Sequence, residues 1–431
     1  MNLEGSTWRR YRLGDVARVM SGYAFKSSEF RESGIPVIKI KNIRSGYVDL
    51  SDVQYVGEKY LSLDKKYHVQ GEDLLISLTG SQITQPSSVV GRVAIHSPKL
   101  GLCLLNQRAG KITVTNLDEC NPLFLYYVLR TEDKARTIAL MAHGSASQAN
   151  VSPTQVEAIE IILPDVETQR KIAAILSAYD DLVENNNRRI KILEEIAQLI
   201  YREWFINFRF PGHENVKMVD STLGMIPEGW EIKKASDAIR VNPHEKTDRE
   251  GKKPYVAMEG LSIKNMIVTV TETRTGSNGA KFRNGDTLFA RITPCLENGK
   301  TGFVQFLESD ETIGIGSTEF IVFRSITLTP EYVYLLSRDE DFRQNAIKSM
   351  SGTSGRQRVR VECFDKYLIA QPDINTLGKF SRVIEPMFRN IYLLSLQIEN
   401  LHRTRNLLLP QLISGEVDIS DLDIDIGENA A

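Results

Sequence analysis

The chain has 431 residues, of which 42% are hydrophobic and 25% are charged, and its formal net charge is −2 at pH 7. This composition excludes a disordered chain and a uniformly basic nucleic-acid coat, and it leaves room for two or three domains with full hydrophobic cores. The sequence contains no long apolar run and no apolar signal core near its start, so we expect neither export nor membrane insertion, and a cytoplasmic location.

The cysteines and histidines of the chain do not form a metal-binding pattern. The four cysteines are far apart, with no C-x-x-C pair, and the six histidines make no H-x-x-x-H pair. Closely spaced ligands of this kind are what structural and catalytic zinc sites require. We therefore expect no metal site and no disulfide framework.

The first part of the chain, residues 1–165, reads as an α+β module. Short β-rich runs are broken by Gly, Ser, Asn and Pro, which is typical of strands joined by turns. A helix is predicted from Pro122 to Met141, followed by a polar loop from His143 to Asn150 and an alternating strand from Ala158 to Leu163.

A long helix follows, from about Thr168 to Phe205. Its apolar residues are spaced alternately four and three apart, which places them on one stripe of a helix and is typical of a coiled-coil seam. One seam position is polar, and a buried amide there favours one register over slipped pairings. The seam residues we single out are Ile172, Leu176, Val183, Asn186, Ile190, Leu193 and Trp204.

The segment 209–229 is rich in Pro and Gly, so it is predicted to be an irregular linker. Beyond it, the first half of the sequence begins again. The matching pairs include Trp8 with Trp230, Asp15 with Asp237, Pro36 with Pro254, Asp73 with Asp286, Gly144 with Gly352 and Pro164 with Pro372. The chain is therefore predicted to be a tandem duplication of one unit, an α+β module followed by a long helix.

The second helix has its own seam, 208 positions after the first, in which Arg405 is the polar exception. Its apolar members include Phe380, Ile384, Leu394, Ile398, Leu401 and Leu408. The simplest arrangement is an antiparallel coiled coil of the two helices, with Trp204 near Phe380 and Ile190 near Leu394. The alternative is two amphipathic helices that pack only on their own modules. Pro386 should kink the second helix or move its start later.

The predicted organisation has six segments: module one at 1–165, helix one at 166–208, the linker at 209–229, module two at 230–373, helix two at 374–415 and an acidic tail at 416–431. An acidic chain end is usually solvated and frayed. Antiparallel helices would relate the two modules by an approximate two-fold axis. Because duplex DNA has two-fold symmetry and is often read at two separated half-sites, DNA is the partner that this arrangement favours.

Four motifs identify a family. They are Arg202-Glu203-Trp204-Phe205, Arg209-Phe210-Pro211-Gly212, Gly224-Met225-Ile226-Pro227-Glu228-Gly229-Trp230, and Leu408-Leu409-Pro410-Gln411-Leu412-Ile413-Ser414-Gly415-Glu416. With the duplication, the chain resembles over essentially its whole length the specificity subunit of type I restriction-modification enzymes.

This resemblance implies that each module is a target recognition domain for one half of an asymmetric, bipartite DNA target. It implies double-stranded DNA and two modification (methyltransferase) subunits as partners, and it allows two restriction (motor-nuclease) subunits in addition. S-adenosylmethionine would be bound by the modification subunit, and ATP and Mg would be used by the motor-nuclease subunit. It implies no cofactor and no catalytic residue in this chain.

Two other classes of function stay open. One is a self-contained DNA-modifying enzyme. The sequence disfavours it, because Gly299-Lys300-Thr301 is not the end of a Walker A loop: Pro294 stands where the first glycine is needed. The other is a coiled-coil adaptor that spaces two protein partners without binding DNA.

Three groups of residues are candidate DNA contacts, because small residues let the backbone approach phosphate while Gln, Asn and Arg can read base edges. The first is a loop and its copy: Gly144, Ser145, Ser147, Gln148 and Asn150, with Gly352, Thr353, Ser354, Arg356 and Arg358. The second follows the first core strand: Lys39, Lys41, Asn42 and Arg44, with Lys264 in module two. The third follows the next core strand: Thr79, Gly80, Ser81 and Gln82, with Arg291, Thr293 and Asn298. For each group the alternative is an ordinary solvated surface.

Overall fold

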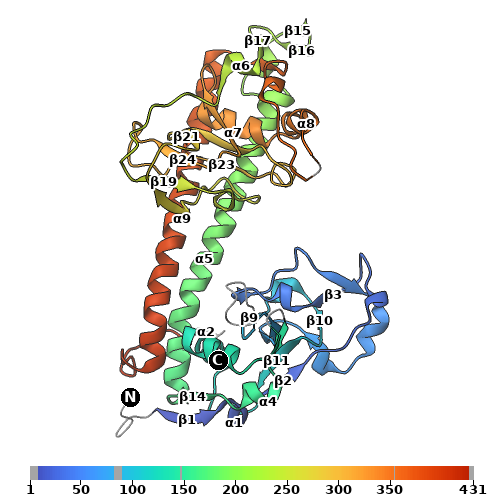
Figure 1. Ribbon diagram of the computed structural model, residues 1–431, viewed down its shortest axis with the longest axis vertical. Helices are drawn as coiled ribbons and strands as arrows, with labels where there is room; N and C mark the ends of the chain where they lie inside the picture. The colour runs from blue at the N-terminus through green and yellow to red at the C-terminus, as the bar shows by residue number, and fades with distance from the viewer. Residues whose placement is uncertain (1–7, 82–89, 146–147, 354, 427–431) are drawn as a thin grey trace. The chain divides into compact units, whose positions relative to one another are not determined.

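The structure is a computed structural model, and it describes residues 8–81, 90–145, 148–353 and 355–426. The chain divides into two compact units, and each contains one module together with parts of both long helices (Figure 1). Unit 1 consists of Met1–Asp181 and Leu401–Ala431, and unit 2 consists of Leu182–Asn400.

The module of unit 1 is built on two mixed sheets. The larger has the strand order β2-β11-β7-β9-β4, and the smaller has the order β5-β3-β10-β6. The strands of the larger sheet are β2 (Ala17–Ser21), β11 (Ala109–Val114), β7 (Leu74–Ser77), β9 (Val93–Ile95) and β4 (Gly46–Tyr47). Those of the smaller sheet are β5 (Gln54–Val56), β3 (Ile35–Ile38), β10 (Cys103–Leu105) and β6 (His68–Val69).

The module of unit 2 repeats both sheets in the same order. Its orders are β18-β25-β22-β23 and β20-β19-β24-β21, which match the first module except for β4. The strands are β18 (Ile239–Val241), β25 (Phe320–Ser325), β22 (Thr287–Ala290), β23 (Thr301–Phe303), β20 (Glu272–Arg274), β19 (Lys253–Val256), β24 (Gly314–Gly316) and β21 (Ala280–Phe282). The predicted tandem duplication of an α+β module is thus confirmed.

The central strand of each module is buried on both faces, because side chains alternate between the two sides of a strand. In β7, Leu74 and Ile76 join one core cluster while Leu75 joins another. In β22, Leu288 and Phe289 are divided in the same way. A continuous apolar run therefore holds two cores together in each module.

Short helices and one further strand pair complete each module. In unit 1, β1 (Arg9–Arg12) pairs antiparallel with β14 (Glu160–Leu163), and in unit 2, β17 (Glu231–Lys234) pairs with β26 (Leu368–Gln371). The helices are α1 (Leu13–Val16), α2 (Pro122–Arg130), α3 (Glu132–Leu140), α4 (Pro153–Glu157), α6 (Ala235–Ala238), α7 (Pro330–Arg338) and α8 (Glu340–Lys348).

The single helix predicted from Pro122 to Met141 is in fact two helices, α2 and α3. Thr131 separates them in an extended backbone conformation, and its hydroxyl accepts a hydrogen bond from the Lys134 amide as the N-cap of α3. Asp339 caps α8 at the equivalent place in unit 2. A capping side chain supplies the partner that the first turn of a helix lacks, so the break is built into the sequence.

The two long helices are α5 (Val166–Tyr201), continued by a π-helical turn at Arg202–Ile206, and α9 (Ile374–Ser414). Each begins after an aspartate that accepts hydrogen bonds from both the amide and the hydroxyl of the threonine three residues on: Asp165 from Thr168, and Asp373 from Thr376. Of the two outcomes expected for Pro386, the later start is excluded, because α9 continues through this residue.

The long helices pack antiparallel within both units (Figure 1). In unit 1, Ile172 and Leu176 from the start of α5 share a core with Leu412 from the end of α9. In unit 2, the rings of Trp204 and Phe380, from opposite ends of their helices, have centroids 5.7 Å apart, as predicted. Ile190 and Leu394 are buried in one cluster there.

All the seam residues are buried or half-buried. Ile172, Leu176, Asn186, Ile190, Trp204, Phe380, Ile384 and Leu394 are buried, and Val183, Leu193, Ile398, Leu401 and Leu408 are half-buried. The Asn186 amide lies 3.5 Å from the Gln397 side-chain oxygen.

One expectation of irregular structure was wrong, and a second holds only in part. The linker contains an antiparallel hairpin of β15 (Met218–Ser221) and β16 (Gly224–Pro227), closed by the Ser221 hydroxyl, which donates to the Gly224 carbonyl at 2.6 Å. In the described part of the tail the acidic side chains are exposed, as expected, but Ile419 is buried in the core of unit 1, and Lys171 donates to the Ser420 carbonyl at 2.7 Å.

Candidate nucleic-acid interface

The structure brings together two of the three predicted groups in unit 2. After β22 ends at Ala290, the Thr293 amide donates to the Gln357 carbonyl at 3.2 Å, and the Val359 amide donates to the Arg291 carbonyl at 2.9 Å. Ser351 and Arg358 exchange backbone hydrogen bonds of 3.0 and 2.9 Å, which closes the loop between them. We call the two segments, 291–298 and 352–358, the paired loops of unit 2.

Unit 1 has the same arrangement at equivalent positions. Strand β8 (Thr79–Gly80) pairs with β13 (Gln148–Asn150), which pairs with β12 (His143–Ser145). Asn150 thus faces both His143 and Thr79, and its counterpart Arg358, 208 positions later, faces Ser351 and Ile292 in the same way. Segments 79–81 and 144–150 are the paired loops of unit 1. Gln82, Ser147 and Ser354 lie outside the described residues, and Ser145 is described by its backbone alone.

Both paired loops require glycine at their first position. Gly144 has φ +143°, and a Cβ there would lie 2.1 Å from the Gln148 carbonyl oxygen. Gly352 has φ +130°, and its Cβ would lie 3.1 Å from the Arg356 carbonyl oxygen. Because other residues are strained in this backbone conformation, the tight turn explains the repeated glycine.

Exposed polar side chains extend from the paired loops, but they differ between the units. Unit 1 presents Gln148 and Asn150, and the Thr79 hydroxyl donates to the Asn150 side-chain oxygen at 2.7 Å. Unit 2 presents exposed Arg356 and Arg358. The same scaffold therefore carries amide groups in one unit and guanidinium groups in the other.

Arg358 is held by a carboxylate that the sequence analysis missed. Its Nε lies 2.8 and 3.1 Å from the two carboxylate oxygens of Glu319, and its Nη2 lies 2.6 Å from one of them. These hydrogen bonds lower the pKa of Glu319 below its ordinary value and raise that of Arg358. Glu319 lies between β24 and β25, 39 positions from Arg358, and no local pattern marks such a distant partner.

The other predicted residues of the third group take different places. Arg291 is half-buried and donates to the Val359 carbonyl at 3.0 Å, so it helps to hold the loop. Thr293 is half-buried, and Asn298 is exposed in the turn that follows, where its amide donates to the Pro294 carbonyl.

The group Lys39, Lys41, Asn42 and Arg44 forms a separate loop whose charges are paired locally. Lys41 lies 2.7 Å from Asp52, Arg44 lies 3.5 Å from Asp49, and the Lys39 ammonium is 3.5 Å from the centre of the Phe30 ring. None of these contacts reaches the paired loops of unit 1.

Asn42 was predicted to contact DNA, and the structure corrects this prediction. It is 2% exposed, and its side-chain amide donates to the Asp49 and Asp52 carbonyls at 2.9 and 3.1 Å. Its oxygen accepts from the Lys39 amide at 3.0 Å. A buried amide with its hydrogen bonds satisfied inside the loop has a structural role, and it does not face a ligand.

Lys264, the counterpart in unit 2, is exposed on a loop beside a polar hollow of about 330 Å³ lined by Glu259, Gly260, Ser262, Asn265, Ile267 and Thr269. The loop is tied to α5, because buried Glu194 accepts a hydrogen bond from the Met266 amide.

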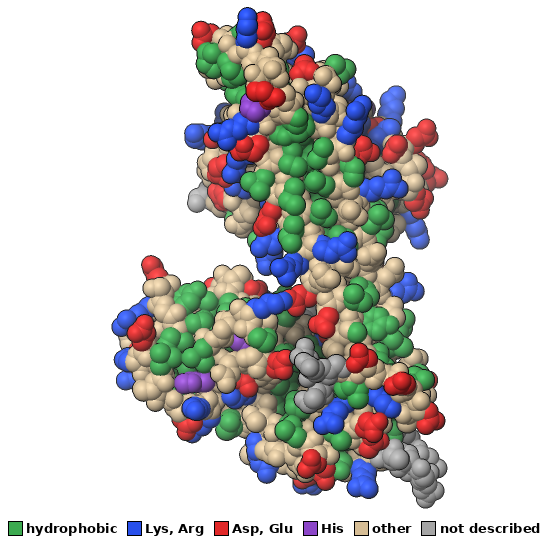
Figure 2. Space-filling model, turned by 180° about the vertical axis from the view of Figure 1, so that it is seen from behind, with side chains coloured by type: hydrophobic (Ala, Val, Ile, Leu, Met, Phe, Trp, Pro, Cys, Tyr) green, Lys and Arg blue, Asp and Glu red, His purple; other side chains and the backbone are tan. Residues whose placement is uncertain are grey.

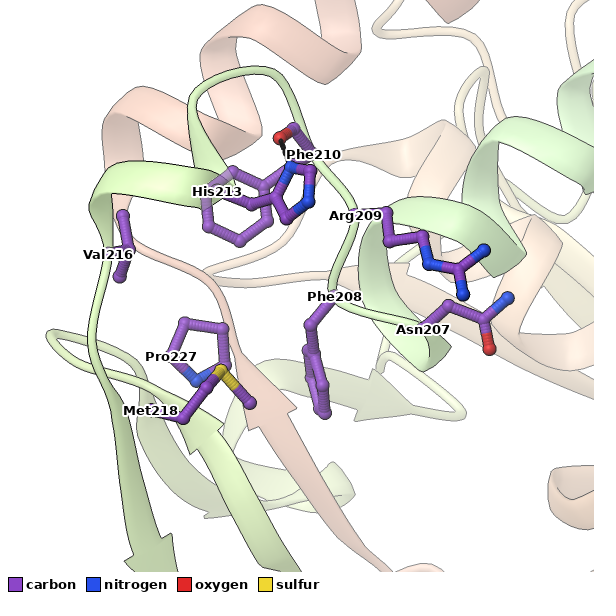
Figure 3. A pocket seen from close by; sticks show the side chains of 8 residues that line it. All are labelled: Asn207, Phe208, Arg209, Phe210, His213, Val216, Met218 and Pro227. Carbon is purple, nitrogen blue, oxygen red and sulfur yellow. Dashed lines mark hydrogen bonds between the residues drawn. The ribbon is translucent and has the colours of Figure 1, made fainter.

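A second hollow, of about 290 Å³, lies in the linker and not at the paired loops. Its lining is mostly apolar, with Phe208, Phe210, Met218 and Pro227 around it and the Arg209 guanidinium at one side (Figure 3). Nδ1 of His213 lies 2.9 Å from the Phe210 carbonyl oxygen. The residues that line this hollow do not form a group of catalytic side chains.

The surface shows no single basic stripe on the face drawn in Figure 2, where Lys and Arg are interspersed with Asp and Glu. Local geometry therefore matters more than net charge. Across the described residues, no helix combines the length and the apolar character needed to cross a membrane.

Comparison with known proteins agrees with the motifs. The family described as "Type I restriction modification DNA specificity domain" matches residues 5–195. The MjaIX specificity subunit of Methanocaldococcus jannaschii is 26% identical over 96% of this chain and 94% of its own length. The EcoKI specificity subunit of Escherichia coli is 21% identical over 98% and 93% of the two chains.

A solved structure has the same fold. The S subunit of a type I restriction-modification system from M. genitalium superposes with a TM-score of 0.56 at 13% identity, covering 96% of this chain and 97% of that one. With the duplicated modules and the antiparallel helices, these matches make the chain similar over nearly its whole length to the specificity subunits of type I restriction-modification enzymes.

Proposed function

We propose that this chain is the DNA-recognition subunit of a type I restriction-modification system, with each module reading one half of a bipartite, asymmetric target. The observation that carries the proposal is the pair of equivalent loops in the two units. Their backbone hydrogen bonding is duplicated, yet the exposed side chains carry amide groups in one unit and guanidinium groups in the other. Loops with the same backbone arrangement but different exposed side chains are suited to two different half-sites.

We further propose that the long helices serve as the scaffold for the modification subunits. Within unit 2, α5 and α9 leave large apolar side chains exposed beside their shared seam: Ile192, Ile196 and Leu199 on α5, and Val383, Leu393 and Leu396 on α9. Figure 2 shows a strip of hydrophobic side chains over this unit. Such surfaces are typical of protein interfaces.

In this proposal the chain is not itself catalytic. Methyl transfer, with S-adenosylmethionine, belongs to the modification subunit, and ATP- and Mg-dependent chemistry belongs to a motor-nuclease subunit. The alternative of an adaptor without DNA binding has no observation in its favour.

The test is a genome-wide map of methylated adenine in cells that express this chain with the modification subunit encoded beside it. Cells that lack only this chain serve as the control. A new methylated motif in two parts, separated by an unspecified gap, is expected. Unchanged methylation in the presence of an active modification subunit would contradict the proposal.

A further inference from the structure

We propose that Arg358, held by Glu319, reads a guanine in the major groove of the half-site bound by unit 2. The inference rests on the proposed DNA-recognition function and assigns one residue pair to one base. The carboxylate of Glu319 accepts hydrogen bonds from only part of the Arg358 guanidinium.

Glu319 uses only one edge of the guanidinium. The three hydrogen bonds, at 2.6, 2.8 and 3.1 Å, involve Nε and Nη2. A guanidinium has five N–H donors in a rigid fork, so the pair at its end, one on Nη1 and one on Nη2, is left over. Within the described residues, Nη1 of Arg358 has no hydrogen bond, and the side chain is 51% exposed.

The end of the fork matches guanine among the four bases. Guanine presents two acceptors, O6 and N7, side by side in the major groove, whereas adenine presents one acceptor and one donor. Two parallel donors therefore form a good pair of hydrogen bonds with guanine and meet a donor at adenine. Phosphate oxygens also accept two such bonds, so orientation and charge must decide between base and backbone.

Glu319 favours the base. Its negative charge offsets that of Arg358 and would repel a phosphate close to the pair, while it leaves the donors at the end of the fork in place. The carboxylate also fixes the side chain before binding, which lowers the entropy cost of ordering it on DNA.

The backbone around the pair is fixed as well. The backbone amides of Arg358 and Ser351 each donate a hydrogen bond to the carbonyl of the other residue. The next residue, Val359, is 1% exposed. The Glu319 carbonyl accepts from the Arg291 amide at 3.0 Å, and the Arg291 carbonyl accepts from the Val359 amide at 2.9 Å. One short segment thus anchors both partners, which is the preorganisation that a specific contact needs.

The experiment uses the complete chain in complex with its modification subunit, and maps methylated motifs for the wild type, Arg358→Ala, Arg358→Lys and Glu319→Gln. The matched control is Asn150→Ala, at the equivalent position of unit 1. For the wild type, one half-site should contain a G·C pair that becomes unspecified in Arg358→Ala, while the other half-site stays unchanged. Asn150→Ala should leave that G·C pair specified, which also identifies the half-site of each unit.

Binding of synthetic duplexes carrying the mapped motif gives the size of the effect. Exchange of the G·C pair should weaken wild-type binding roughly ten- to hundred-fold, and Arg358→Ala should abolish this discrimination. Arg358→Lys, which lacks the fork, should keep little of it. Glu319→Gln should bind all duplexes with a steeper dependence on salt and discriminate less.

Three results would overturn the inference. They are a wild-type half-site for unit 2 without a G·C pair, an Arg358→Ala variant that keeps every position specified, and an equal loss of binding to all sequences with a smaller salt dependence, which indicates a phosphate contact. The other positions of the half-site read by unit 2, which stay specified in Arg358→Lys and Glu319→Gln, show that unit 2 is folded in these variants. If the wild type itself gave no bipartite motif, the proposed function, and not this residue assignment, would have failed.

Discussion

At the scale of single residues, one unusual group is the carboxyl of Glu194 on α5. It is 7% exposed, and burial raises its pKa from 4.5 to about 7, against the opposing effects of the Met266 amide and the charge of Arg338. Burial without a full ion pair disfavours the charged form. The carboxyl holds the loop that carries Lys264, so its protonation state is coupled to the stability of unit 2.

Glu194 should therefore make unit 2 less stable as the pH rises. Between about pH 4.5 and 7 the folded chain keeps a proton that the unfolded chain has released, so the free energy of unfolding falls through this window and stays low above it. Glu194→Gln keeps the acceptor without the charge. It should be more stable than the wild type at pH 8.5, by up to about 3 kcal/mol, and similar to it at pH 5.

The measurement is urea unfolding followed by tryptophan fluorescence in a Trp8→Phe background, so that only Trp204 and Trp230 of unit 2 report. Glu195→Gln, a neighbouring exposed residue, is the control. A difference between Glu194→Gln and the wild type that is the same at both pH values would contradict the assignment.

The residue scale also shows where sequence reasoning reaches its limit. The repeated glycines and the polar character of the paired loops could be predicted, because one half of the sequence can be compared with the other. Glu319 could not, since it meets Arg358 only through the fold, and Asn42 was placed among the DNA contacts because a polar residue in a loop does not reveal its burial.

At the scale of elements, the seam of α9 contains one charge, Arg405, which is 8% exposed. Its guanidinium donates to Asp180 on α5, which also accepts from the Tyr127 hydroxyl at 2.9 Å and from Arg130 at 3.4 Å. The heptad pattern revealed Arg405 as an exception but not its partner, because Asp180 lies beside the seam and not on it.

Removal of Asp180 should leave Arg405 without compensation between the helices. We expect Asp180→Ala to destabilise unit 1 by roughly 2–4 kcal/mol, somewhat less than for a fully buried pair because Asp180 is partly exposed. The double variant Asp180→Leu with Arg405→Leu should recover much of the loss. Hydrogen exchange of the amides of α2 and of the first turns of α5 would measure both, and equal effects of single and double variants would argue against the pairing.

The secondary structure was predictable in the same uneven way. The long helices and the duplication of the modules follow from periodicity and repetition, which are properties of the sequence itself. The break at Thr131, the hairpin in the linker and the packed tail depend on individual hydrogen bonds and on contacts with distant residues, such as that of Lys171 with Ser420.

At the scale of the whole molecule, the duplication predicts that the two halves of the target are independent. Replacement of residues 230–373 with the second module of a relative that methylates a different motif should change one half-site and leave the other intact. The methylation map described above would show this, and the reciprocal exchange of residues 1–165 is the matched control. A change in both half-sites after either exchange would contradict the assignment of one half-site to each module.

The path of the chain through the two units has a consequence for biosynthesis. Unit 2 is a continuous stretch of sequence, whereas unit 1 takes Leu412 and Ile419 from the far end of the chain into its core. The ribosome therefore releases all of unit 2 before the first module has its full set of core residues. A messenger RNA truncated before the codon for residue 401 would yield an intact second unit. In the first unit it would leave Ile172 and Leu176 without the apolar surface that covers them.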